Sequence, residues 1–137
     1  MVRVKLDRDA LGLSSILERV THAEVKDCFK EDGILYVIVA TGDVGKAIGK
    51  GGVNIHRLQE ELGSKIKIIE YKDSVADFIR TIIHPLKIEE VVEEGGHILL
   101  RDSNRKAKSL LIGRDGKQLQ VINRAVQRFF SKEVKVE

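Results

Sequence analysis

The stretch Ile48-Gly49-Lys50-Gly51-Gly52-Val53-Asn54-Ile55 occurs a second time in the chain, as Ile112-Gly113-Arg114-Asp115-Gly116-Lys117-Gln118-Leu119. Both copies have the pattern apolar-Gly-x-x-Gly-x-x-apolar, and their first glycines lie 64 residues apart in a chain of 137 residues. Repetition at close to half the chain length indicates one small module that is used twice.

Each Gly-x-x-Gly stretch is a candidate phosphate-binding loop. Two glycines three residues apart let the backbone turn sharply and keep side chains away from an approaching backbone. Apolar residues at helical spacings follow each copy, so we expect a helix to begin at each loop, with its free N–H groups and positive dipole end available to a phosphate. Lys50 and Arg114 add positive charge inside the turns. A single such loop is often only a tight turn between helices, but the repetition favours contact with a nucleic acid.

The composition is that of a folded protein with a mild basic excess. Hydrophobic residues make up 42% of the chain and charged residues 33%, with a formal net charge of +3. Residues 101–117 carry six basic and two acidic side chains, and residues 43–57 carry three and one, so the positive charge gathers at the two loops. This distribution favours a polyanionic partner. Because the sequence has neither a long apolar run nor a signal-peptide pattern, we expect a cytoplasmic protein without membrane contact.

Cysteine and histidine usage argues against a metal site. Cys28 is the only cysteine, so neither an intramolecular disulfide nor a cysteine-based metal site is expected. Alternation along residues 23–29 places it opposite Ala23, Val25 and Phe29 and predicts partial exposure. The four histidines lack close metal-ligand spacing, and we expect no cofactor.

Hydrophobic periodicity and turn residues predict the same order of elements in both halves of the chain. In the first half we expect an extended segment over 2–5, a helix capped by Asp7 with Leu13, Ile16, Leu17 and Val20 inward, strands over 23–29 and 34–40 joined by a turn at 31–33, a short helix capped by Asp43, the loop, a helix to Leu62 closed by Gly63, and a strand over 65–71. In the second half we expect a helix opened by a Ser74–Asp77 capping box and ended near Pro85, strands over 88–92 and 98–100 joined by a turn at 93–96, a basic helix from Asn104 to Gly113, the loop, a helix to Phe130, and a strand over 133–136.

This arrangement resembles tandem KH domains of the prokaryotic type (type II) over nearly the whole chain. Four stretches are further similar to the NusA group, especially its short archaeal members: residues 42–52, Ile69-Glu70-Tyr71, His84-Pro85-Leu86-Lys87 and residues 111–116. The resemblance implies an α+β fold of two KH domains, 1–72 and 73–137, each a three-stranded sheet with helices packed on one face.

The resemblance also implies that the protein binds single-stranded RNA, without catalysis, as a transcription elongation or termination factor. RNA polymerase or the transcription elongation complex would be a further partner, although bacterial members carry an N-terminal polymerase-binding domain and an S1 domain for which this chain has no room. The RNA-binding residues implied are the turns, their basic flanks and the aliphatic groove: Lys46, Ile48, Gly49, Lys50, Gly51, Gly52, Ile55, Arg57, Lys108, Ile112, Gly113, Arg114, Asp115, Gly116, Lys117 and Leu119.

Some of these residues have alternative interpretations. Ile66 or Ile68 and Val134 or Val136 would add to the groove from the strands, but simple core packing is the alternative for all the aliphatic positions. The carboxylate of Asp115 offsets Arg114, so we expect the first loop to be the stronger electrostatic contact.

Other functions compete with this interpretation. Residues 45–51 superficially resemble the P-loop of a phosphate-binding enzyme, but the first Gly is one residue too close to the Gly-Lys pair, and Gly51 replaces the required Ser or Thr. An aromatic content of 4% argues against an RNA-recognition motif or an OB-fold, which stack bases on aromatic rings. A ribosome-associated or ribosome-assembly KH protein, and a protein-interaction module with purely structural glycine turns, remain open.

Overall fold

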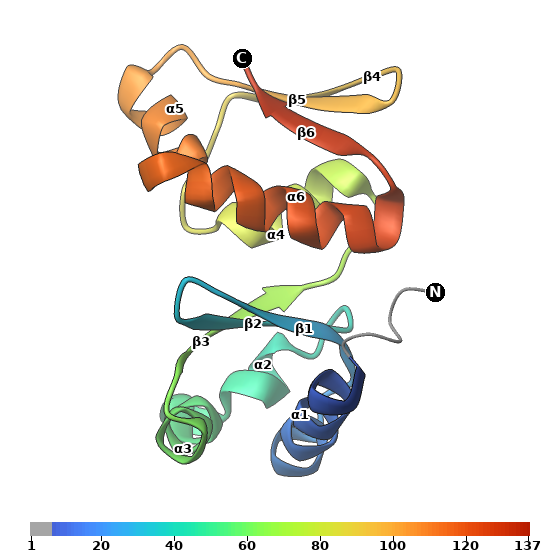
Figure 1. Cartoon of the computed structure of the whole chain (residues 1–137), viewed down its shortest axis with the longest axis vertical. Coiled ribbons are helices and arrows are strands. Elements are labelled where there is room, and N and C mark those ends of the chain that lie inside the picture. The colour runs from blue at the N-terminus through green and yellow to red at the C-terminus, as the bar shows by residue number, and fades with distance from the viewer. Residues whose placement is uncertain (1–6) are drawn as a thin grey trace. The chain divides into compact units, whose positions relative to one another are not determined.

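The same order of helices and strands occurs twice along the chain (Figure 1). The computed structural model describes residues 7–137, with side chains from Gly12 onward. The predicted extended segment over 2–5 lies outside the described residues, and the predicted capping by Asp7 depends on a side chain outside them. The chain divides into two compact units, Met1–Tyr71 (unit 1) and Lys72–Glu137 (unit 2). The predicted α+β fold, with one three-stranded sheet in each half, is confirmed.

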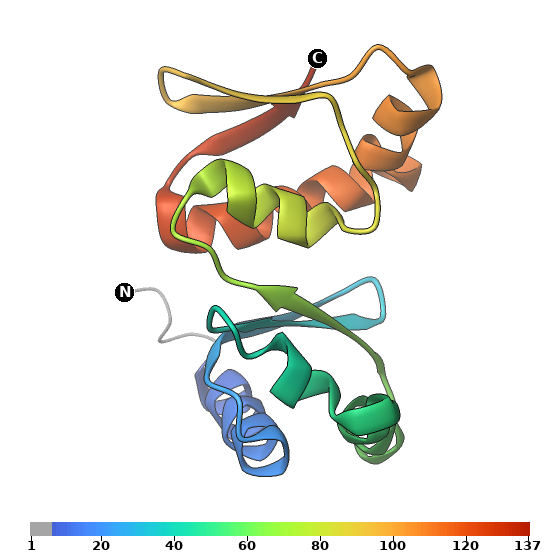
Figure 2. The ribbon, with the colours of Figure 1, turned by 180° about the vertical axis from the view of Figure 1, so that it is seen from behind.

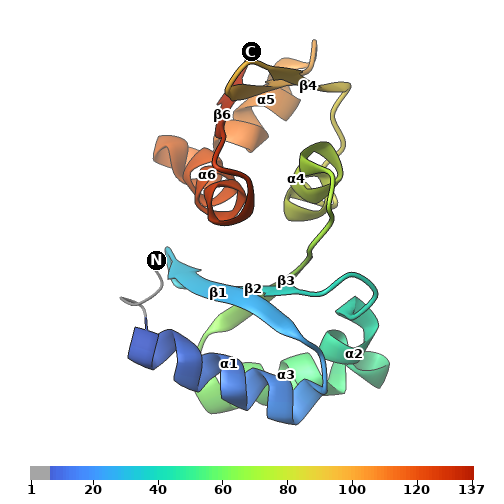
Figure 3. The same cartoon turned by 90° about the vertical axis from the view of Figure 1, so that its right-hand side faces the viewer.

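Unit 1 packs its helices on one face of its sheet (Figure 3). Strand β2 lies in the centre of the sheet, antiparallel to β1 and parallel to β3. The core between helices and sheet includes Leu17, Val37 and Leu58, all of which are buried. The elements of unit 1 are α1 (Asp7–Thr21), β1 (Val25–Glu31), β2 (Ile34–Val39), α2 (Val44–Ile48), the 3-10 turn η2 (Lys50–Gly52), α3 (Val53–Leu62) and β3 (Lys65–Glu70).

Turn residues set the ends of several unit 1 elements. Asp32 and Gly33 form a two-residue hairpin turn with φ of 53° and 80°, the left-handed conformation that such turns require. Helix α3 ends at Gly63, whose φ is 64° and whose N–H donates to the carbonyl of Gln59 at 2.9 Å, as the sequence predicts.

Cys28 is buried, so the predicted partial exposure is wrong. The register of β1 against β2 shifts between Val25 and Asp27, which marks a bulge. Because a bulge inserts one residue into the alternation, Val25 and Cys28 both pack against the core that the helices cover, whereas simple alternation would place them on opposite faces.

Unit 2 repeats the arrangement, with α4 and α6 side by side on one face of its sheet (Figure 2). The ring of Phe78 lies 5.7 Å, centroid to centroid, from the rings of both Phe129 and Phe130. Strand β5 is antiparallel to β4 and parallel to β6. The elements of unit 2 are α4 (Val75–Ile83), β4 (Glu90–Glu94), β5 (His97–Arg101), α5 (Arg105–Ile112), the 3-10 turn η3 (Arg114–Gly116), α6 (Lys117–Phe130) and β6 (Glu133–Val136).

The first strand of unit 2 begins two residues later than the sequence predicts. The carboxylate of Asp102 accepts a hydrogen bond from the N–H of Glu89 at 3.0 Å and another from the N–H of Asn104 at 2.8 Å. These two bonds hold Glu89 beside the end of β5, so regular pairing starts only at Glu90. None of the helices in the described part of the chain has the length and hydrophobicity needed to cross a membrane.

Candidate nucleic-acid interface

The two Gly-x-x-Gly loops have the same backbone conformation. The first glycines have φ and ψ of 80° and 164° at Gly49 and of 78° and 173° at Gly113. The last glycines have 80° and 13° at Gly52 and 74° and 11° at Gly116. The hydrogen bonds match as well, because Gly52 N–H donates to the Gly49 carbonyl at 3.0 Å and Gly116 N–H to the Gly113 carbonyl at 3.1 Å. The repeat seen in the sequence is therefore a repeat of geometry.

The third residue of each loop is left-handed, although only one copy has glycine there. Gly51 has φ 65° and ψ 17°, and Asp115 has φ 57° and ψ 26°. Aspartate is one of the few residues besides glycine that adopts this region readily. A carboxylate can therefore occupy the second loop without changing the path of its backbone.

The first glycine of each loop serves packing. A Cβ on Gly49 would lie 2.8 Å from Cγ of Asn54, and a Cβ on Gly113 would lie 2.6 Å from Cβ of Gln118. In the first loop, the amide of Asn54 also donates to the carbonyl of Lys46 at 2.9 Å. The first glycine thus lets the following helix fold back against the loop, and no other residue fits without a shift.

Gly51 in the first loop and Gly116 in the second face open space. A Cβ placed on Gly51 or Gly116 would meet no atom within 4 Å. Sterically, these positions are free for a ligand backbone to approach.

Helices α3 and α6 begin at the loops without side-chain caps. Their N-cap residues are Gly52 and Gly116, and within the described chain no N-cap side chain accepts a hydrogen bond from their first turns. Elsewhere, Ser74 accepts from the N–H of Asp77 at 3.4 Å and Asn104 accepts from the N–H of Ala107 at 3.0 Å, so α4 and α5 are capped. The N–H groups of Val53 and Lys117 donate to the carbonyls of Lys50 and Arg114, and no capping side chain competes with an anion at either loop.

Exposed apolar side chains gather at the same two loops. Among the residues whose side chains are described, the exposed large hydrophobic side chains are Ile48 (37% exposed), Val53 (58%), Leu110 (52%) and Ile112 (40%). Ile48 and Val53 flank the first loop, and Leu110 and Ile112 precede the second. Val53 and Leu110 are absent from the predicted site, because helical spacing places Val53 with the core residues and Leu110 has no distinguishing sequence signal beside the buried Leu111.

The predicted site residues all lie in or beside the loops, with different degrees of exposure. Those exposed are Lys46, Ile48, Lys50, Gly51, Arg57, Ile112, Arg114, Asp115 and Lys117. Those half-buried are Gly49, Gly52, Ile55, Lys108, Gly113, Gly116 and Leu119. Ile55 and Ile68 pack against the core of unit 1, and Ile66 and Val134 are buried, which favours the core interpretation for these four side chains.

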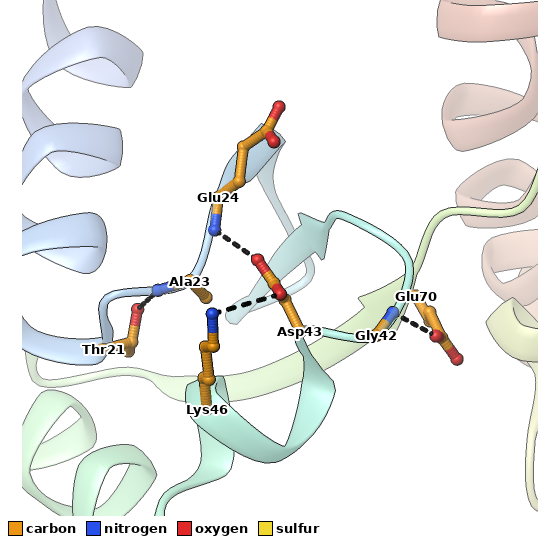
Figure 4. A network of polar contacts seen from close by, with 7 residues as sticks. All are labelled: Thr21, Ala23, Glu24, Gly42, Asp43, Lys46 and Glu70. Carbon is orange, nitrogen blue, oxygen red and sulfur yellow. Dashed lines mark hydrogen bonds and ion pairs between the residues drawn. The ribbon is translucent and has the colours of Figure 1, made fainter.

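The sequence predicts that Asp43 caps α2, and this prediction is wrong. Asp43 instead holds the start of α2 in place. Its backbone conformation is not that of a capping residue, and its carboxylate accepts a hydrogen bond from the N–H of Glu24 at 2.8 Å (Figure 4). The same carboxylate lies 3.7 Å from Nζ of Lys46. On the other side, the N–H of Gly42 donates to the Glu70 carboxylate at 2.7 Å. These contacts anchor the segment that leads into the first loop and orient Lys46.

Two further basic residues differ in their surroundings. Nε of Arg57 lies 3.3 Å from the carboxylate of Glu61, one turn further along α3. Arg114 is exposed beside Asp115 in the second loop. Within the described residues, no three histidine, cysteine or acidic side chains cluster as metal ligands would.

The chain is similar to known proteins in sequence and in structure. A family model described as the KH domain matches residues 34–83, which include the first loop. A protein of Methanocaldococcus jannaschii named "Probable transcription termination protein NusA" is 34% identical over 123 residues, covering 88% of this chain and 67% of that protein. A protein of the same name from Methanococcus vannielii is 34% identical over 128 residues, covering 91% of this chain and 72% of the other. The crystal structure of APE1850 superposes with a TM-score of 0.77 at 25% identity, covering 94% of this chain and 98% of that one.

Proposed function

Because the chain belongs to the NusA family of KH-domain proteins, we propose that it binds single-stranded RNA through both Gly-x-x-Gly loops and acts in transcription termination or elongation. Units 1 and 2 each act as one KH domain, with the domains spanning residues 1–72 and 73–137. The protein binds RNA in the cytoplasm and carries out no catalysis.

One observation carries this proposal: an uncapped helix N-terminus, an open glycine turn and exposed aliphatic side chains coincide twice. The N–H groups of α3 and α6 supply donors for the phosphates of an RNA backbone. Gly51 and Gly116 leave room for that backbone, and Ile48 and Ile112 offer apolar surface to the bases. KH domains bind four nucleotides of single-stranded RNA with such a loop.

The names of the relatives favour transcription over ribosome assembly. Both archaeal relatives are named probable transcription termination proteins, so RNA polymerase or the elongation complex is the partner we propose. Co-purification of the tagged chain with RNA polymerase supports this partner, whereas co-purification with ribosomal particles supports the ribosomal alternative.

The RNA site is tested with a double variant, Gly51→Asp plus Gly116→Asp. Both positions are sterically open, and the left-handed Asp115 shows that aspartate fits such a turn. The two added carboxylates repel phosphates, so we expect most of the affinity for short labelled single-stranded RNAs to be lost in fluorescence anisotropy. For the unaltered protein, affinity should fall as salt concentration rises.

A matched control adds the same charge elsewhere. Gly33 and Gly95 lie in the two hairpin turns with φ of 80° and 63°, and a Cβ at either would also meet nothing within 4 Å. The variant Gly33→Asp plus Gly95→Asp should therefore bind RNA within about twofold of the unaltered protein, since added charge far from a contact is largely screened. Equal binding by the loop variant and the control would make the loops structural.

A further inference from the structure

The imidazole of His56 lies against the last glycine of the first loop. His56 is the fourth residue of α3, and helical side chains point back toward the N-terminus of their helix. A Cβ built on Gly52 would lie 3.3 Å from Cδ2 and 3.5 Å from Nε2 of His56. The ring therefore lies at the edge of the turn over which the phosphate is proposed to bind.

This ring is available to a ligand. His56 is exposed, and in the part of the chain that the structure describes its ring makes no hydrogen bond or ion pair. The charged residues closest to the loop and to His56 along the chain are Lys46 on α2, Lys50 on η2, and Arg57 and Glu60 on α3. Lys46 lies 3.7 Å from Asp43 and Arg57 lies 3.3 Å from Glu61, whereas His56 lies directly against the last glycine of the turn.

The second loop has no equivalent group. Gln120 takes the position of His56, 64 residues further along, and a Cβ on Gly116 would meet no atom within 4 Å. The two loops share a backbone, but only the first has a titratable ring beside its last glycine.

We propose that His56 is a further RNA-contact residue, specific to the first loop, which donates a hydrogen bond from its imidazole to the phosphate held there. This inference rests on the proposed RNA-binding function of the loop. A protonated imidazole brings a positive charge to such a contact, so its hydrogen bond to the phosphate becomes charge-assisted at low pH. The affinity of the first loop for RNA then increases with acidity, and that of the second loop does not.

The test compares His56→Gln with the unaltered chain at about pH 5.5 and about pH 8. Glutamine is the residue of the second loop, and it keeps a polar group without the charge. We expect the variant to bind single-stranded RNA about threefold to tenfold more weakly at the lower pH, and within about twofold at the higher pH. The slope of log affinity against log salt should also decrease by about 0.7 at the lower pH only, as expected for one lost phosphate contact.

His97→Gln is the control, because His97 lies on β5 and its ring is 3.4 Å from Glu133. This variant should keep the pH response of the unaltered chain. A second readout is the NMR signal of the His56 ring, identified by its loss in His56→Gln, which should shift when RNA is added.

The outcomes separate the two proposals. If His56→Gln keeps the affinity, the pH response and the salt slope of the His97→Gln control while RNA still binds, the role of His56 is overturned and the loop function stands. If the unaltered chain binds no RNA at either pH, both are overturned.

Discussion

The first and second loops share one backbone but present different side chains to a ligand. In both, the first glycine packs against the next helix, the third and fourth residues are left-handed, and the following helix has no side-chain cap. The differences between the copies, aligned at a spacing of 64 residues, include Lys46 against Leu110, Gly51 against Asp115, Val53 against Lys117, and His56 against Gln120. The comparison shows that a few glycines determine the turn, which leaves the surrounding surface free to change. The first loop has Lys46 before the turn and His56 after it, and the second has more apolar surface before the turn and a carboxylate within it.

The largest expected effect is on stability, and it distinguishes the first glycine of each loop, which packs against the next helix, from the sterically open Gly116. Gly113→Ala should lower the free energy of unfolding by about 3 kcal/mol, because φ of 78° with ψ of 173° is strained for alanine and its Cβ would lie 2.6 Å from Gln118. Gly49→Ala should behave alike. Gly116 is left-handed but sterically open, so Gly116→Ala should lower the free energy of unfolding by only about 1 kcal/mol. Urea unfolding of the three variants measures the difference. If Gly113→Ala and Gly116→Ala lowered the free energy of unfolding equally, the two glycines would not have different structural roles.

The next effect concerns the carboxylate in the second loop. Asp115→Gly gives the second loop the residue of the first, and Gly51→Asp does the reverse. We expect Asp115→Gly to raise RNA affinity about twofold to fivefold and Gly51→Asp to lower it by a similar factor, since one exposed charge beside a phosphate contributes about 0.5–1 kcal/mol. Anisotropy titrations at low and high salt measure both, and the two effects should shrink as salt rises. Changes of the same sign in both variants would contradict this account of the asymmetry.

A smaller effect should follow from exchanging Lys46 and Leu110. Both side chains are exposed, so Lys46→Leu and Leu110→Lys should leave thermal stability nearly unchanged. We expect Lys46→Leu to reduce the salt slope of RNA binding by about 0.7 and Leu110→Lys to increase it by about the same amount. Leu111→Ala provides a contrast, because that neighbouring leucine is fully buried and its truncation should lower stability without a specific effect on the slope. An unchanged slope in both exchange variants would show that neither position lies near a phosphate.

The smallest effect compares the central strands of the two sheets. Tyr36 on β2 is buried where unit 2 has Leu99 on β5, and burial, followed by the charges of Asp32 and Glu31, raises the pKa of its hydroxyl above 10.0. A raised pKa in the folded state means that stability is fully present below pH 10.0 and is lost as pH rises through the folded value. Urea unfolding at neutral and strongly alkaline pH should therefore show a larger loss for the unaltered chain than for Tyr36→Phe. An identical loss in the two proteins would mean that Tyr36 does not contribute.

Local patterns predicted much of the candidate site. The loops, the helices after them and the exposed basic flanks follow from glycine spacing and hydrophobic period within about a dozen residues. Val53 and Leu110 could not be identified in this way, because helical spacing marks Val53 as a core residue and gives no indication that Leu110 is exposed while Leu111 is buried. The sequence also could not show which glycine of each loop packs against the next helix, since this depends on where Asn54 and Gln118 lie in space.

The sequence by itself determined the order of elements, the two glycine turns and the gathering of positive charge near them, because each is encoded by neighbouring residues. Only the tertiary structure decided the role of Asp43, whose carboxylate binds the N–H of Glu24 on a segment 19 residues earlier. It also decided the burial of Cys28 through a bulge in the register of β1 and the late start of β4 through Asp102. These features depend on hydrogen bonds and strand pairing between segments distant in sequence, and local propensity does not encode such contacts.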